Sequence, residues 1–290
     1  MRSSRRDEWV RRGIFAAWGL AWALLLLAAT QARAGGAINP SALSEAYRLP
    51  ALFDAIAHEG RDAADAIAQD VLRGQAGAAW ARAIDDIYDP ERLHDRFLGL
   101  LSAELQRRAP VYEAAMDFAR SPAGAAVIEA EVRIRAELRE PGAERDMEAQ
   151  LERARGIESP ALAFVRERIG ANNLIEQNVS IGLNGSLAYF RGFMAAAPPG
   201  MGLSEGQIAA EVWAQEEEIR AETVDWLEGY LLRAYAALSD GVRAALMAHA
   251  RSAEGDAFNT AMFRAYEVTF AELSEALGIA VGRALQMREL

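Results

Sequence analysis

Histidine and carboxylate side chains are the residues of this chain whose types could bind a metal ion or move a proton. His58, Glu59 and Asp62 lie at positions i, i+1 and i+4, so His58 and Asp62 would share one face of a helix. A helical zinc site of the metalloprotease type needs a second histidine where Asp62 stands. We therefore favour a solvated helix face here over a metal site.

The densest acidic cluster lies between residues 85 and 95. Its members are Asp85, Asp86, Asp89, Glu91, His94 and Asp95. The spacing differs from that of an EF-hand loop and lacks its bidentate glutamate, although a divalent cation remains an alternative. Asp89 stands before Pro90, which is typical of a helix N-cap, and a helix boundary explains most of the cluster. We expect no metal site and no cofactor.

Amide side chains gather in a second segment, from residue 172 to residue 184. Asn172, Asn173, Gln177 and Asn178 are flanked there by aliphatic residues. Buried amides could line a ligand pocket within residues 172–193, or they could form hydrogen bonds between helices. The second use is the more common one for buried polar groups.

A third segment combines a cap, a proline and a glycine. Ser121 is expected to cap a helix that begins at Pro122, and Gly124 would let another backbone approach its first turn. We interpret the segment as a structural corner. The alternative is an anion site, because a helix N-terminus offers free N–H groups and Arg120 lies beside it.

The same local pattern occurs twice. Residues 119–124, Ala-Arg-Ser-Pro-Ala-Gly, are echoed 131 positions later by residues 250–255, Ala-Arg-Ser-Ala-Glu-Gly. With Phe118 before it, the first copy resembles the F-x-R-S-P-x-G signature of the bacterial family called domain of unknown function 2059. The resemblance covers residues 93–131, and a degenerate copy near residues 224–262 has Ala253 and His249 in place of Pro122 and Phe118. It implies an exported, all-helical protein, and it implies no reaction or substrate.

Composition excludes several classes of protein. The 290 residues carry a net charge of −11, all 31 basic residues are arginine, and cysteine is absent. Thiolate metal sites, disulfides and cysteine nucleophiles are therefore excluded. An acidic chain without lysine is also a poor nucleic-acid binder. The nucleophile elbow and the phosphate-binding loop are absent as well, so we expect no enzymatic activity. Carboxylates that converge from different helices remain the one enzymatic alternative.

The amino terminus has the pattern of a secretory signal peptide over residues 1–34. Five arginines lie in the first twelve residues, an uncharged run follows from Ile14 to Ala29, and Ala32-Arg33-Ala34 matches a signal-peptidase site. We expect cleavage after Ala34, a periplasmic location and a mature chain of net charge −15. The alternative is an uncleaved membrane anchor, for which the 16-residue apolar run is short.

The remaining pattern indicates an all-α fold of about ten helices. Leu93, Phe97, Leu101 and Leu105 recur at helical spacing, and a longer stripe runs from Ile208 to Tyr230. Ser159-Pro160 and Ser204-Glu205-Gly206-Gln207 mark further helix starts. From the echoed motif we expect two related halves, over residues 35–158 and 159–290.

These observations favour a non-enzymatic protein that acts through protein contacts in the cell envelope. Its partner would be an envelope protein of unknown identity, with no nucleic acid, and membrane contact would come only from an uncleaved signal. The alternative is a periplasmic helical protein that binds a small ligand or a divalent metal.

Overall fold

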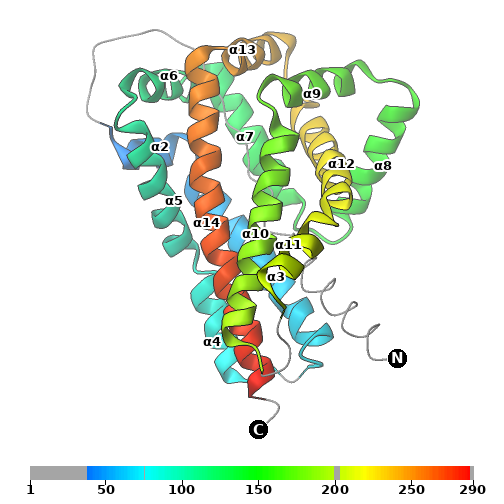
Figure 1. The fold of residues 1–290 in the computed structure, drawn as a ribbon. Coiled ribbons are helices and arrows are strands. Elements are labelled where there is room, and N and C mark those ends of the chain that lie inside the picture. Colours follow the sequence, from blue (N-terminus) through cyan, green and yellow to red (C-terminus); the bar gives the residue numbers. More distant parts are fainter. Residues whose placement is uncertain (1–37, 75, 199–202, 288–290) are drawn as a thin grey trace.

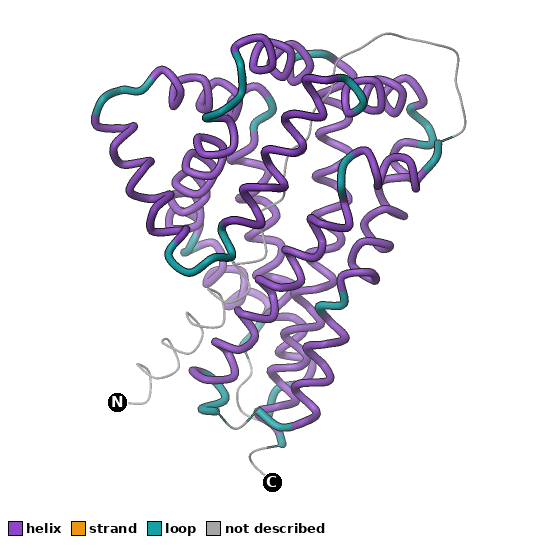
Figure 2. Tube along the Cα trace, turned by 180° about the vertical axis from the view of Figure 1, so that it is seen from behind, coloured by secondary structure: helices purple, strands orange, loops and turns teal. Residues whose placement is uncertain are grey.

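The computed structural model describes residues 38–74, 76–198 and 203–287. Within these ranges the chain is all-α, as predicted, and no strand occurs (Figure 2). The predicted signal peptide lies outside the described residues. In the part of the chain that the structure describes, no helix is long and apolar enough to cross a membrane.

The described helices are labelled α2 to α14. Their bounds are α2 Pro40–Ala46, α3 Leu49–Asp70, α4 Ala78–Ile87, α5 Pro90–Leu105, α6 Ala109–Ala119, α7 Pro122–Glu137, α8 Ala143–Gly156, α9 Pro160–Ala171, α10 Leu174–Ala196, α11 Glu205–Trp213, α12 Glu216–Tyr235, α13 Asp240–Ala250 and α14 Ala253–Gln286.

Most of the predicted helix starts are confirmed by their hydrogen bonds. The Asp89 carboxylate accepts from the Arg92 backbone N–H at 3.0 Å, and Ser204 and Gln207 form the reciprocal capping box. Helix α9 begins at Pro160 as expected, but the Ser159 side chain makes no capping hydrogen bond. Proline at the first helical position fixes the backbone angle there without that bond.

The apolar stripes predict the buried faces correctly, but the longer stripe belongs to two helices. Leu93, Phe97, Leu101 and Leu105 all face the core from α5. The longer stripe is divided between α11 and α12 by a turn at residues 214–215. Glu216, Glu217 and Glu218 then occupy the first turn of α12, where carboxylates are favoured by the helix dipole. Trp213 lies outside the stripe; as a large aromatic residue it would be expected in the core, but it is 63% exposed at the end of α11.

Helices α10 and α14 form the long central pair of the molecule (Figure 1). Glycines allow the two backbones to approach closely. A Cβ atom on Gly278 of α14 would lie 2.0 Å from the Tyr189 carbonyl oxygen of α10, and one on Gly192 of α10 would lie 2.1 Å from the Glu275 carbonyl oxygen. Aromatic side chains of α10, Tyr189, Phe190 and Phe193, are buried beside this contact.

The two copies of the sequence motif fold into corners with the same hydrogen bonds. Ser121 Oγ accepts from the Gly124 backbone N–H at 3.0 Å, and Ser252 Oγ accepts from the Gly255 N–H at 3.0 Å. A Cβ atom on Gly124 would lie 2.1 Å from the Phe118 carbonyl oxygen, and one on Gly255 would lie 2.2 Å from that of His249. Each motif therefore ends one helix and begins the next at the same close backbone contact.

The helices around the two corners also pack reciprocally. Helix α6 packs on α14 while α13 packs on α7, and α5 packs on α14 while α12 packs on α7. Single left-handed residues join α2 to α3 at Arg48 (φ 50°) and α9 to α10 at Asn173 (φ 54°). One set of helices is α5 to α7, and the other is α12 to α14. Because buried side chains of both sets belong to one hydrophobic cluster, the two sets share a core. Helix α8 lies in the chain between them.

Candidate functional site

A cleft runs along α8 and α12 and consists of two hollows that share Trp226. The hollows measure about 500 and 530 Å³ and are lined by successive turns of α8. The first is lined by His58, Glu59, Asp62, Arg135, Leu138, Arg139, Glu140, Pro141, Gly142, Glu144, Arg145 and Trp226. The second is lined by Met147, Glu148, Leu151, Glu152, Arg155, Glu222, Asp225, Trp226 and Gly229.

Arg135 and Trp226 form the base of the first hollow. The Arg135 side chain is 2% exposed and forks onto Glu59, with Nε donating to Oε1 at 2.7 Å and Nη2 to Oε2. Its guanidinium carbon lies 5.3 Å from the centroid of the Trp226 ring, and Tyr230 stacks on the same indole at 4.7 Å. These contacts fix the indole between the two hollows, because its ring already packs against the protein's own cation and phenol.

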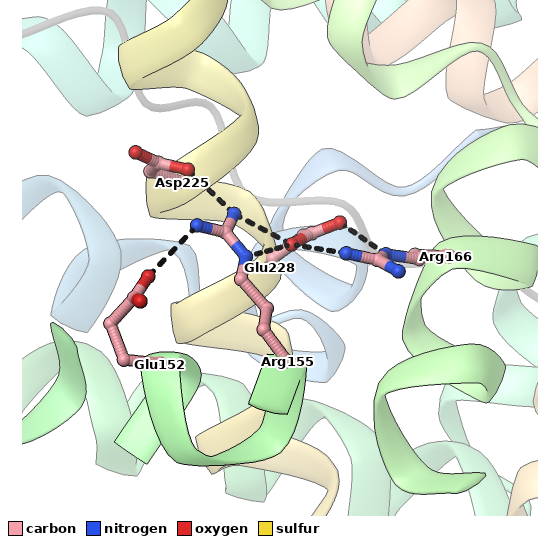
Figure 3. Close-up of polar contacts among 5 residues, drawn as sticks. All are labelled: Glu152, Arg155, Arg166, Asp225 and Glu228. Atoms are coloured by element: carbon pink, nitrogen blue, oxygen red, sulfur yellow. Dashed lines mark hydrogen bonds and ion pairs between the residues drawn. The ribbon is translucent and has the colours of Figure 1, made fainter. Parts of the chain in front are cut away.

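A network of five charged side chains closes the far end of the second hollow (Figure 3). Arg155 contacts Asp225 at 2.6 Å, Glu228 at 2.8 Å and Glu152 at 3.2 Å. Arg166 donates to the other oxygen of Glu228 at 2.6 Å. Burial alone would raise the pKa of Glu228, but the hydrogen bonds from Arg166 and Arg155 outweigh it and lower that pKa. Two guanidiniums thus tie α8 and α9 to α12.

Four carboxylates of the cleft make no side-chain hydrogen bond or ion pair with any residue of the described ranges: Glu140, Glu144, Glu148 and Glu222. The pKa of Glu144 is raised, first by burial and then by the neighbouring charges of Glu59 and Glu148. The pKa of Glu222 is raised by burial and by Glu218. Neighbouring like charges raise a carboxyl pKa where negative potential is not neutralised. The first hollow also contains Arg135, Arg139 and Arg145, which nearly balance its carboxylates. The excess of negative charge therefore lies in the second hollow, where four carboxylates face Arg155.

The residues of the F-A-R-S-P-A-G motif lie on another part of the molecule, at the α6–α7 corner. Phe118 is buried and stacks on His249 at 5.2 Å with an interplanar angle of 12°. Ser121 caps α7, Pro122 occupies its first turn and Arg120 is exposed. The cap and the close approach at Gly124 are those of the predicted corner, and the anion site stays a prediction.

The amide segment divides between core and surface. Asn172 is buried and donates to the Ala250 carbonyl at 2.8 Å and to Asp256 at 3.0 Å, so it joins α9 to the α13–α14 corner. Asn178 bonds within its own helix and Asn173 forms the left-handed joint. Gln177, with Glu176 and Ser180, lines a hollow of about 270 Å³ between α10 and α14.

The metal alternatives find no support in the geometry of the described ranges. His58 lies 3.5 Å from Asp62, and both are largely exposed. In the acidic cluster Asp89 is the N-cap of α5, Asp86 pairs with Arg92, and Asp95 accepts from His94 at 3.0 Å. Among the residues described, no group of three or more His, Asp or Glu is placed to hold a metal ion.

Sequence reasoning did not anticipate a buried polar cluster where α7, α9, α12 and α13 meet. Glu131 is fully buried, and its Oε1 accepts from the Tyr235 hydroxyl at 2.5 Å. Arg168, also fully buried, donates from Nη1 to Asn172 at 2.9 Å. Burial raises the pKa of Glu131 to about 8, although Tyr235 and Arg168 oppose the shift. Burial and the charge of Arg168 lower the pKa of His249 to about 3. At neutral pH both side chains are therefore largely uncharged.

No protein-family model, curated protein or solved structure matches the chain. The resemblance carried by residues 118–124 thus stays a prediction.

Proposed function

We propose that this protein is exported and acts without catalysis, by binding a segment of a protein partner in the cleft along α8 and α12. The observation that carries the proposal is the pair of hollows on either side of Trp226. Ion pairs and stacking hold its base rigidly, and its rim carries carboxylates without a partner in the described ranges. A preformed groove with an apolar base and a polar rim is typical of a site for protein recognition.

Export is supported by the signal-peptide pattern and by the resemblance of the Phe118–Gly124 motif to an exported helical family. Fractionation of cells that make the full chain tests this location. We expect the protein in the periplasmic fraction, with Gly35 as its first residue. Recovery of the uncut chain from the membrane fraction would instead favour the anchor.

Partner binding is tested with the tagged full chain and two charge-reversed variants. Glu148→Lys/Glu222→Lys changes exposed positions on opposite walls of the cleft, and Glu45→Lys/Glu275→Lys changes two exposed carboxylates outside it. We expect an envelope protein that the wild type and the outside variant recover and the cleft variant loses. A set of recovered proteins that is the same for all three would contradict the proposal.

A small ligand between α10 and α14 is the second candidate. The hollow beside Gln177 also contains Arg264 and Glu267, so it offers an amide and charges of both signs. A rise in melting temperature with a small zwitterionic or divalent ligand, lost in Gln177→Ala, would favour this function over the first.

A further inference from the structure

The second hollow has an apolar floor between two rows of carboxylates. Met147 and Leu151 of α8 are buried at the floor. Gly229 of α12 lies opposite, where an added Cβ would come within 3.0 Å of Met147 Cγ. One wall carries Glu148 and Glu152 at helical spacing, and the other carries Glu222 and Asp225. The occupant must therefore present an apolar group downward and positive charge to both sides.

The positive charge already present does not balance these walls. Arg155 is the basic residue of the second hollow, and it is shared among Glu152, Asp225 and Glu228. The Glu148 and Glu222 side chains make no ion pair or hydrogen bond in the part of the chain that is described. The chain as a whole has 42 acidic against 31 basic residues, so its long-range field also attracts cations.

The length of the cleft limits the size of the occupant. It follows α8 from Glu144 to Arg155, which is about 16 Å at the rise of an α-helix. An extended chain of about five residues spans that distance. In an extended segment, alternate side chains point to opposite sides. A single metal ion would fill neither the length nor the apolar floor.

We infer that the cleft takes a basic, extended segment of a protein partner, about five residues long, in which lysine or arginine alternates with an apolar residue. The inference rests on the proposed function and specifies its partner. The apolar side chains face the floor and cover Met147 and Leu151. The basic side chains leave the opposite face of the segment, and their long flexible stems let the charged groups bend back to Glu148 and Glu222 on the two walls.

Calorimetric titration of the full mature chain with capped five-residue peptides tests the inference. The probe alternates lysine and leucine and begins and ends with lysine. One control peptide has glutamate in place of lysine, another has glycine in place of leucine, and spermidine serves as a cation without an apolar group. We expect binding of the lysine–leucine peptide that weakens as salt is added. The glycine peptide and spermidine should bind more weakly, and the glutamate peptide should not bind.

Two neutral variants assign the binding to the cleft. Glu148→Gln/Glu222→Gln is expected to weaken the lysine–leucine peptide about tenfold, which corresponds to about 1.4 kcal/mol for two exposed charge contacts. Glu45→Gln/Glu275→Gln removes the same charge outside the cleft and should leave binding unchanged. Circular dichroism melting shows whether each variant is folded.

Equal weakening by both pairs would overturn the inference, as would equal binding of spermidine or of the glutamate peptide. The two claims can also fail separately. If an envelope partner is lost only from Glu148→Lys/Glu222→Lys but none of the peptides binds, the proposed function stands and the inference of a basic segment is wrong. If the peptide binds in the cleft but no such envelope partner is found, the cleft's preference for a basic segment would stand and the proposed function would fail.

Discussion

Glu131 and His249 show how burial sets the charge of single side chains in this protein. Both are fully buried, on α7 and α13. They are uncharged near neutral pH because burying a charged group is costly, and for Glu131 this cost outweighs the opposing effects of Tyr235 and Arg168. The buried Arg168 side chain lies nearby and donates to Asn172. Their shifted pKa values make the stability of the fold depend on pH in opposite directions.

Glu131→Gln should flatten the pH dependence of stability between pH 6.5 and 8. An unfolded glutamate titrates near pH 4.5 and the buried Glu131 near 8. The folded state therefore holds a proton that the unfolded state has lost, and the free energy of unfolding falls as the pH rises through this window. The slope is at most about 1.4 kcal/mol per pH unit. Urea unfolding at several pH values measures it, and an unchanged slope in the variant would place the proton elsewhere.

In His249→Phe, the gain in the free energy of unfolding that comes from protonated Glu131 should become measurable between pH 6.5 and 4.5. Because the folded pKa of His249 is about 3 and its ordinary value is 6.5, the histidine makes the fold less stable as the pH falls below 6.5. In the wild type this loss offsets the gain from Glu131 between pH 6.5 and 4.5. The variant, which places phenylalanine opposite Phe118, should become more stable as the pH falls. Unfolding curves that show equal trends for both proteins would contradict this reasoning.

Local patterns predicted side-chain roles well only where the partner is near in the sequence. The Ser121 and Asp89 caps act over three residues, and both are present. Glu131 and Tyr235 are 104 positions apart, so neither residue type indicated their contact in advance. Trp213 shows that residue type alone does not predict burial, since this large aromatic side chain is exposed at the end of α11.

At the scale of helices, glycine determines how closely α10 and α14 approach. The Tyr189 carbonyl lies where a side chain at position 278 would begin, so the contact requires a residue without a Cβ atom. This spacing brings together the buried aromatic residues of α10 and α14, and it supports the core on which α12 packs.

Gly278→Ala should destabilise the protein by about 1–3 kcal/mol, because the added methyl group overlaps the Tyr189 carbonyl and forces the helices apart. Gly99→Ala is the matched control in α5, where nothing lies within 4 Å of the added Cβ. That change should stabilise by roughly 0.5–1 kcal/mol, as expected for glycine in an exposed helix interior. The two variants are compared by the urea concentration at which each is half unfolded, provided that the free energy of unfolding depends equally on urea in both. Similar midpoints would refute the close contact.

The arrangement of the whole molecule follows partly from the repeated motif. Ala-Arg-Ser at positions 119 and 250 predicted two equivalent corners, and their hydrogen bonds match. The reciprocal packing of α6 on α14 and α13 on α7 is what two related halves would produce, although the division at residue 158 stays a prediction.

The cleft could not be predicted from the same pattern. It forms where α8, the helix between the two sets, packs on α12, and Arg155 and Asp225 meet there across 70 positions. In the sequence, Glu148 and Glu222 are indistinguishable from other exposed glutamates. Only the packing places them on facing walls above an apolar floor.

Photo-crosslinking in living cells tests most directly whether this cleft is the binding site. A photoreactive amino acid is placed in turn at positions 148 and 222 in the cleft and at positions 45 and 275 outside it, all of which are exposed. We predict one envelope protein crosslinked from both cleft positions and from neither outside position, through a basic segment of its sequence. Equal crosslinking from all four positions, or a partner captured only from positions 45 and 275, would contradict the account.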